Sequence, residues 1–86
     1  MSHKPPLDDW RRQGQERYLR GLIWSHRKYQ MRSPHSDHEH CEFCYAKFSE
    51  SAADLQEGYT SQDNYRWVCE PCFRDFRDEM SWKLVP

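Results

Sequence analysis

Cys41-Glu42-Phe43-Cys44 and Cys69-Glu70-Pro71-Cys72 are two C-x-x-C pairs, and together they contain every cysteine of the 86-residue chain. The pairs are separated by 24 residues, from 45 to 68. This spacing is typical of a zinc ion held by four thiolates in tetrahedral geometry. Such a site leaves no coordination position open for a substrate, so it stabilises a fold rather than performing catalysis. We therefore predict one structural zinc ion bound by Cys41, Cys44, Cys69 and Cys72.

Two disulfides are the alternative use of four cysteines, and they can form in any of three connectivities. The N-terminal residues contain no apolar stretch able to act as a signal-peptide core, and the chain has no apolar run long enough to cross a bilayer. The expected location is therefore the reducing cytoplasm, which favours zinc over disulfides. A redox-active pair of the thioredoxin kind would need a longer α/β pattern. Iron is a weaker competitor for the same four sulfurs.

The composition indicates that the fold depends on a metal. Apolar residues form 36% of the chain, whereas globular domains typically contain roughly 45 to 50%. The core alone is expected to contribute only a few kcal/mol, and zinc binding adds on the order of 10 kcal/mol to folding. Aromatic residues form 15% of the chain and bury much area for their number. We expect one small α+β domain stabilised by zinc.

The N-terminal part of the chain predicts a helix followed by a strand. Leu7 to Tyr18 is expected to form a short helix capped by Asp8 or Asp9, although Gly14 weakens its middle by about 1 kcal/mol. From Tyr18 to Tyr29, apolar and aromatic residues alternate in a way that favours a strand. A continuation of the helix is the alternative for this stretch.

The cysteine-containing part follows a polar connector at residues 33 to 37, where Pro34 disfavours helix. The first cysteine pair is expected to form a tight knuckle. Ser51 to Leu55 is expected to form one or two helical turns that end at Gly58, because serine and aspartate stand at capping-box spacing there. The stretches 58 to 61 and 65 to 69 then predict a β-hairpin around Gln62-Asp63-Asn64.

The C-terminal segment predicts a helix that begins at the second cysteine pair. Pro71 suits a first helical position. The apolar face of this helix consists of Cys72, Phe73, Phe76 and Met80. Residues 82 to 85 predict a final short strand. A knuckle, a hairpin and a helix in this order resemble the treble-clef zinc fold over about Asp37 to Met80, a resemblance that is specific for fold and weak for function.

Three segments of the chain resemble a family of small uncharacterised bacterial proteins. The segments are Asp8-Asp9-Trp10-Arg11-Arg12-Gln13-Gly14-Gln15, Asp37-His38-Glu39-His40-Cys41-Glu42-Phe43-Cys44-Tyr45-Ala46-Lys47-Phe48 and Trp67-Val68-Cys69-Glu70-Pro71-Cys72-Phe73. The resemblance implies a compact zinc-binding bacterial protein. It assigns no activity to any residue.

Histidines gather immediately before the first cysteine pair. His35, His38 and His40 lie there with Asp37 and Glu39, and they could form a second metal site or provide a catalytic base. We favour a loop of solvated histidines, or of histidines hydrogen-bonded near the zinc ligands, because four cysteines already complete a zinc site. No His-Asn-His nuclease order, Ser-His-Asp set or phosphate-binding glycine loop is present. An enzyme that uses His38 or His40 is therefore the third of our three functional hypotheses.

Charge divides the chain into two segments that we expect to belong to one fold. Residues 1–34 form a basic N-terminal extension with eight Lys or Arg and three Asp or Glu, a balance of +5. Residues 35–86 form an acidic four-cysteine zinc module with five Lys or Arg and eleven Asp or Glu, a balance of −6. An acidic zinc module argues against phosphate contacts there. The basic extension contains Trp10, Tyr18, Trp24 and Tyr29 among Arg11, Arg12, Arg17, Arg20, Arg27 and Lys28.

The aromatic and basic residues of the extension have two interpretations. They could form a groove that stacks single-stranded nucleic acid. We favour the alternative, in which the aromatic residues belong to the core and the basic residues neutralise the acidic module.

The leading functional hypothesis is a cytoplasmic, non-enzymatic, zinc-containing module that binds another protein, without a membrane partner. Acidic side chains would attract a basic partner and set the association rate, while an exposed aromatic residue would supply affinity. An immunity-type inhibitor of a basic nuclease, or a regulatory adaptor, is a concrete form of this hypothesis. Nucleic-acid binding through the N-terminal half is the second hypothesis. In the leading hypothesis, the acidic side chains that would attract a basic protein partner are those of Glu50, Asp54, Glu57, Asp75, Asp78 and Glu79.

Overall fold

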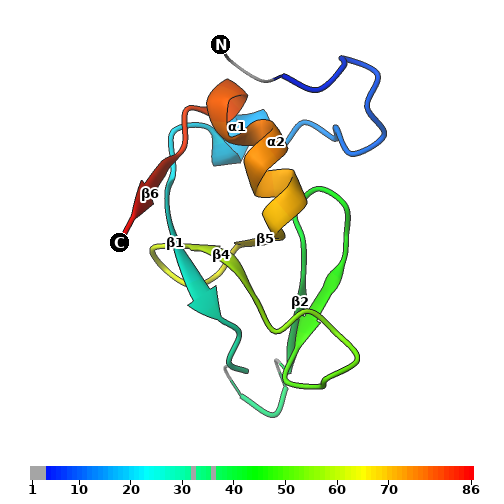
Figure 1. Ribbon diagram of the computed structural model, residues 1–86, viewed down its shortest axis with the longest axis vertical. Coiled ribbons are helices and arrows are strands. Elements are labelled where there is room, and N and C mark those ends of the chain that lie inside the picture. The colour runs from blue at the N-terminus through cyan, green and yellow to red at the C-terminus, as the bar shows by residue number, and fades with distance from the viewer. Residues whose placement is uncertain (1–3, 32, 36) are drawn as a thin grey trace.

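The computed structural model describes residues 4–31, 33–35 and 37–86. In chain order the elements are α1 (Glu16–Leu19), β1 (Ile23–Lys28), β2 (His38–His40), β3 (Lys47–Ser49), β4 (Glu57–Ser61), β5 (Trp67–Val68), α2 (Glu70–Met80) and β6 (Lys83–Val85). One sheet has the strand order β5-β4-β1-β6, and a second sheet pairs β2 with β3. In Figure 1 the longer helix, α2, lies beside α1 and the N-terminal loop at one end of the molecule, and the β2-β3 hairpin lies toward the other end. The protein is a small α+β domain.

Strand β1 joins the two differently charged parts of the chain in one sheet. It pairs antiparallel with β4, where Trp24 faces Ser61, and parallel with β6, where Trp24 faces Leu84. The predicted strand over residues 18–29 is confirmed at its centre. Residues 18 and 19 belong instead to α1, and the chain turns at Gly21, whose φ of +77° is readily available only to glycine. The predicted final strand is confirmed as β6.

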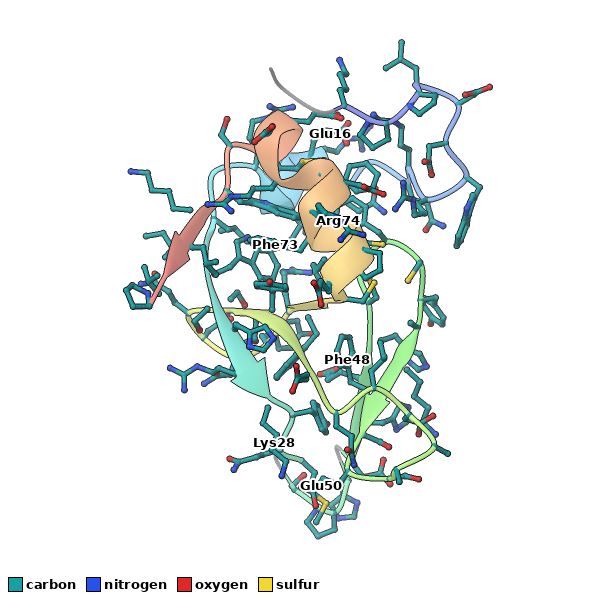
Figure 2. All side chains as sticks on the ribbon, viewed as in Figure 1. Glu16, Lys28, Phe48, Glu50, Phe73 and Arg74 are labelled. Atoms are coloured by element: carbon teal, nitrogen blue, oxygen red, sulfur yellow. The ribbon has the colours of Figure 1, made fainter. Side chains whose placement is uncertain are left out.

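The core is built mainly from aromatic rings that α2 packs against β1 and β4. Trp24 is fully buried, and the centroid of its ring lies 5.0 Å from that of Trp82. Phe73 stacks on Tyr59 with 3.9 Å between the ring centroids. Figure 2 shows Phe73 between α2 and the strands. The four apolar residues predicted on one face of α2 are all buried, so the helical spacing read from the sequence is confirmed. Stacked and tilted aromatic pairs add stability beyond their buried area, which suits a chain with few aliphatic residues.

The predicted hairpin is present as β4 and β5, with the turn at residues 62–64. Gly58 lies inside β4, where the chain passes the ring of Phe48. A Cβ atom at Gly58 would lie 2.6 Å from Cε1 of Phe48 and 3.0 Å from the carbonyl oxygen of Val68. This glycine is therefore required by close packing, and it does not terminate a helix as we predicted.

The predicted helix from Leu7 to Tyr18 is wrong over most of its length. Residues 7–15 form turns, and helical structure begins only at Glu16. Gly14 has a φ of +81°, which is incompatible with a right-handed helix. Asp9 accepts a hydrogen bond from the backbone N–H of Arg11 at 2.9 Å, so it caps a turn rather than a helix.

The helical turns predicted at residues 51–55 are also absent. This segment forms hydrogen-bonded turns, and Leu55 bonds back to β3 through the carbonyl of Lys47 at 3.0 Å. The hydroxyl of Ser49 donates to Asp54 at 2.7 Å, so the aspartate does not complete a capping box with Ser51. Side-chain bonds to nearby groups compete with the helix here.

The segment before the first cysteine pair is more regular than we predicted. Residues 38–40 form β2, in which Glu39 faces Phe48 across the pair with β3, whereas the sequence had indicated a loop. In the predicted connector, residue 36 lies outside the described residues. The short hairpin places the first cysteine pair directly at its end.

Candidate metal centre

The sulfur atoms of Cys41, Cys44, Cys69 and Cys72 all lie within 4.8 Å of one another. The sulfur atoms of Cys44 and Cys69 lie 3.4 Å apart, and all four cysteines are free thiols. A tetrahedral site with zinc–sulfur bonds of about 2.3 Å places its sulfurs about 3.8 Å apart. The cluster therefore has the size and the donor atoms for one zinc-type ion. In Figure 2 sulfur atoms, drawn yellow, gather beside the first turn of α2.

The first cysteine pair forms a knuckle at the end of β2. The N–H of Cys41 donates to the carbonyl of Ala46 at 2.8 Å, which closes the loop, and the N–H of Phe43 points at the sulfur of Cys41 at 3.4 Å. Tyr45 has a φ of +68° and reverses the chain after Cys44. A backbone N–H directed at a thiolate stabilises its negative charge and fixes its orientation.

The second pair is positioned by the start of α2. Cys69 is the residue at the N-cap and keeps an extended conformation, and Cys72 lies in the first helical turn. The N–H of Cys69 also points at the sulfur of Cys41, at 3.4 Å, so it links the two pairs. The positive end of a helix favours thiolates. Cys41, Cys69 and Cys72 are at most 5% exposed, and Cys44 is half-buried.

The thiols of the cluster share protons unequally. Hydrogen bonds from Cys69 and then Cys72 lower the pKa of Cys41 to about 2. The bond with Cys41 in turn raises the pKa of Cys69 to about 12 and raises that of Cys72 well above its usual range. The hydrogen bonds between these sulfurs therefore favour the charged form of Cys41. A bound cation would deprotonate the other thiols, so metal binding would release protons.

Arg11 and Arg12 connect the N-terminal loop to the helix that carries Cys72. Arg11 donates to the sulfur of Cys72 at 3.5 Å and to Asp75 at 3.0 Å, and two nitrogens of its guanidinium bond Asp9. Arg12 bonds both carboxylate oxygens of Glu79 at 2.7 and 2.8 Å. The opposite charges of the chain's two parts thus compensate one another inside the molecule.

Gln15 is a buried polar residue that the sequence reasoning missed. Its side-chain nitrogen donates to the carbonyls of Arg11 and Glu42 at 2.6 and 3.0 Å, and its oxygen accepts from the N–H of Gln13 at 2.6 Å. It is 2% exposed. Gln15 therefore fastens the N-terminal loop to the knuckle. A glutamine among charged residues carries no sequence signal for such a role.

The histidines predicted as alternatives do not converge with the cysteines. His38 bonds Asp37 at 2.8 Å near the surface, His40 stacks on Tyr45, and His35 is exposed. Within the part of the chain that the structure describes, the four cysteines are the one group of three or more potential metal ligands. Among these residues the three histidines thus contribute to no second metal cluster.

The basic N-terminal extension is largely folded against the domain. Trp24 and Tyr29 are at most 2% exposed, so neither can stack a base. Arg20 bonds the carbonyl of Glu79 at 2.9 Å. Trp10 and Tyr18 are 69% and 45% exposed, so our expectation that the aromatic residues of the extension belong to the core is wrong for these two. The stacking surface that the sequence suggested is therefore incomplete.

The six acidic residues predicted to attract a partner differ in their surroundings. Asp75 and Glu79 pair with arginines of the N-terminal loop, and Asp54 lies 3.8 Å from Lys47. Glu57 lies 3.6 Å from His26 and is well exposed. Glu50, which Figure 2 labels at the far end of the molecule from α1, and Asp78 are exposed as well.

Fold and site together define a small α+β domain with a four-cysteine cluster of metal-binding geometry. Comparison with protein-family models, curated proteins and solved structures gives no match. The resemblance to a bacterial family therefore stays a prediction. Among the described residues, no helix has the length and the apolar character needed to cross a membrane.

Proposed function

We propose that the chain is a zinc-stabilised module that binds another protein, and that its four cysteines hold one structural zinc ion. The order of knuckle, hairpin and helix supports a treble-clef arrangement of the metal site. We assign no catalytic role. Four sulfur ligands would complete the coordination of zinc and leave no position open for a substrate.

The observation that carries this proposal is the exposure of Trp10 beside the metal centre. Its side chain is 69% exposed, whereas Trp24, Trp67 and Trp82 are at most 5% exposed. A chain that uses its other tryptophans in the core keeps this large aromatic surface in water. Tryptophan is among the residues that contribute most energy to protein interfaces.

The charges around this position support a basic partner. The acidic module keeps exposed carboxylates such as Glu57 and Glu70 near the cysteines. Opposite charge on a partner would accelerate association and select against acidic competitors. An immunity-type inhibitor of a basic enzyme, or a regulatory adaptor, in the cytoplasm, is consistent with this chemistry.

Affinity capture from the native cell tests the proposal. The zinc-loaded chain, carrying a tag, is incubated with cell extract, and bound proteins are identified by mass spectrometry. The matched control is the Cys72→Ser variant, which is expected not to fold. A partner that is enriched with the folded chain and can be reconstituted from purified components is the expected result. Binding of nucleic acid alone, or no reproducible partner, would contradict the proposal.

Nucleic-acid binding remains the second candidate because one basic surface is still available. Arg27 and Lys28 are exposed at the end of β1, where with Gln30 and Asn64 they line a hollow of about 560 Å³. Cationic side chains without buried partners can contact phosphates. Trp67, which also lines the hollow, is 5% exposed and offers little surface for stacking. We therefore rank this function below protein binding.

A further inference from the structure

A groove runs along the outer side of the cysteine cluster. It has a volume of about 670 Å³, and Cys44, Cys69 and Cys72 form part of its lining. Pockets that hold ligands typically measure roughly 300 to 1,000 Å³, so the groove has room for several side chains. Its apolar lining is provided by Trp10, Ala46, Leu55 and Pro71.

Trp10 is held in place at one wall of the groove. On one side, the N–H of Asp9 bonds the carbonyl of Pro6 at 3.0 Å. On the other, Arg11 and Arg12 pair with Asp75 and Glu79 of α2. The backbone on both sides of the indole is therefore anchored although the ring itself is exposed. A partner that contacts it would lose little conformational entropy from this chain.

The groove also has a negative balance of charge. Its lining includes four carboxylates, those of Asp9, Glu57, Glu70 and Asp75, and one guanidinium, that of Arg11, which leaves −3. Arg11 is already bonded to Asp9 and Asp75, so Glu57 and Glu70 remain the carboxylates best placed to meet a cation. An apolar surface bordered by carboxylates is complementary to an apolar side chain flanked by basic residues.

We propose that this groove binds a short segment of a partner protein in which one apolar anchor residue is flanked by lysine or arginine. The anchor packs against Trp10, Leu55 and Pro71, and the flanking cations meet Glu57 and Glu70. The proposal rests on the proposed function, which it makes specific by naming the surface and the chemistry of the partner.

A phage-displayed library of random linear peptides tests the groove without knowledge of the natural partner. The library is selected on the immobilised, zinc-loaded chain, and the dominant sequence is synthesised and titrated by fluorescence anisotropy. We expect sequences with an aromatic or aliphatic residue between basic residues. Trp10→Ala should weaken binding by roughly tenfold or more, because truncation of an interface tryptophan typically has an effect of this size.

Matched variants separate the groove from general surface effects. Leu7→Ala removes an even more exposed apolar residue of the same loop, 80% exposed, that does not line the groove. It should change the dissociation constant by less than about twofold. The double variant Glu57→Lys, Glu70→Lys should abolish binding, whereas Glu16→Lys, Glu50→Lys, with the same change of charge elsewhere, should retain most of it. Zinc content and the thermal midpoint show whether each variant is folded. If Trp10→Ala is unstable, the charge variants test whether the peptide binds in the groove.

Several results would overturn the proposal. They are enrichment of acidic or purely polar peptides, absence of any enriched sequence, and unchanged binding to folded Trp10→Ala. Sedimentation that shows a dimer dependent on Trp10 would assign the groove to a second copy of the chain instead. Capture from cell extract distinguishes a failure of the groove proposal from a failure of the proposed function. A partner retained by Trp10→Ala would leave the proposed function intact and reject the groove, whereas no partner for the unaltered chain would reject the function itself.

Discussion

The guanidinium of Arg11 lies 3.5 Å from the sulfur of Cys72, although the two residues are 61 positions apart. The same side chain bonds Asp9 and Asp75 and lies over the ring of Phe76, 4.7 Å from its centroid. One arginine thus connects the N-terminal loop, the four-cysteine cluster and the apolar face of α2. Formation of the metal site and docking of the N-terminal loop should therefore stabilise each other.

The first prediction concerns metal content and its link to folding. The chain purified without added metal should contain one zinc ion, as measured by elemental analysis. Cys72→Ser should be largely unfolded by far-UV circular dichroism, because it removes a ligand whose binding energy contributes to folding. His38→Ala should remain a folded zinc protein, since His38 bonds Asp37 at the surface. Two disulfides and no metal would refute this prediction.

The second prediction tests the contact between Arg11 and Cys72. Arg11→Met should lower zinc affinity by roughly 10- to 100-fold, the typical effect of removing a group that hydrogen-bonds a metal ligand. Competition with a chromogenic chelator at constant pH measures this change. Arg12→Met is the control, because Arg12 bonds Glu79 and no cysteine. Equal affinities of the two variants would show that Arg11 acts only on the fold.

The third prediction concerns the pair between Arg12 and Glu79, whose side chains are 16% and 13% exposed. Two short hydrogen bonds between charged groups in a partly buried place should be worth about 1 to 3 kcal/mol. A double-mutant cycle with Arg12→Met and Glu79→Gln, followed by urea unfolding of the zinc-loaded proteins, measures the coupling energy. A coupling near zero would place this pair with ordinary surface ion pairs.

The fourth prediction contrasts two glycines. Gly58→Ala places a Cβ against the fully buried ring of Phe48 and a carbonyl of β5, so it should destabilise the fold by about 1 to 3 kcal/mol through overpacking. Gly21→Ala meets no atom within 4 Å, and its cost of about 1 kcal/mol should come from the left-handed backbone alone. Urea unfolding of both variants decides between them. A larger loss for Gly21→Ala would contradict the packing described for β4.

The fifth prediction addresses nucleic acid. Arg11 and Arg12 are engaged in internal pairs, so Arg27 and Lys28 are the residues to test. We expect no saturable binding of single- or double-stranded oligonucleotides at physiological salt in a fluorescence-anisotropy titration. Binding at the tight end of the roughly 10⁻⁴ to 10⁻⁶ M range of non-specific binders, lost in Arg27→Gln, Lys28→Gln, would favour the second candidate function.

Local patterns in the sequence predicted several elements correctly because neighbouring residues determine them. The spacing of Cys72, Phe73, Phe76 and Met80 follows the helical repeat, and all four are buried in α2. The turn residues between β4 and β5 indicated the hairpin. The two C-x-x-C pairs indicated a metal cluster, since a short loop brings each pair together and only the distance between pairs depends on the fold.

The failures arose where distant groups compete with local propensity. Residues 7–15 have a helical pattern, yet Arg11 and Arg12 bond carboxylates of α2, and those bonds replace helical structure. The segment 51–55 is tied to β3 through backbone bonds that no local pattern reveals. A contact between side chains more than 60 positions apart, such as that of Arg11 with Cys72, cannot be inferred from periodicity, because periodicity indicates only which face of an element is apolar.

The amino-acid sequence by itself determined the cysteine donors, the helix that presents two of them and the opposite charges of the two parts of the chain. Only the tertiary structure decided that those charges meet inside the molecule, that Trp24 and Tyr29 are buried while Trp10 is exposed, and that a groove borders the four-cysteine cluster. Ligand type and helical periodicity are properties of residues and their near neighbours. Exposure and charge pairing depend on which distant segments share a surface, and that is settled by packing.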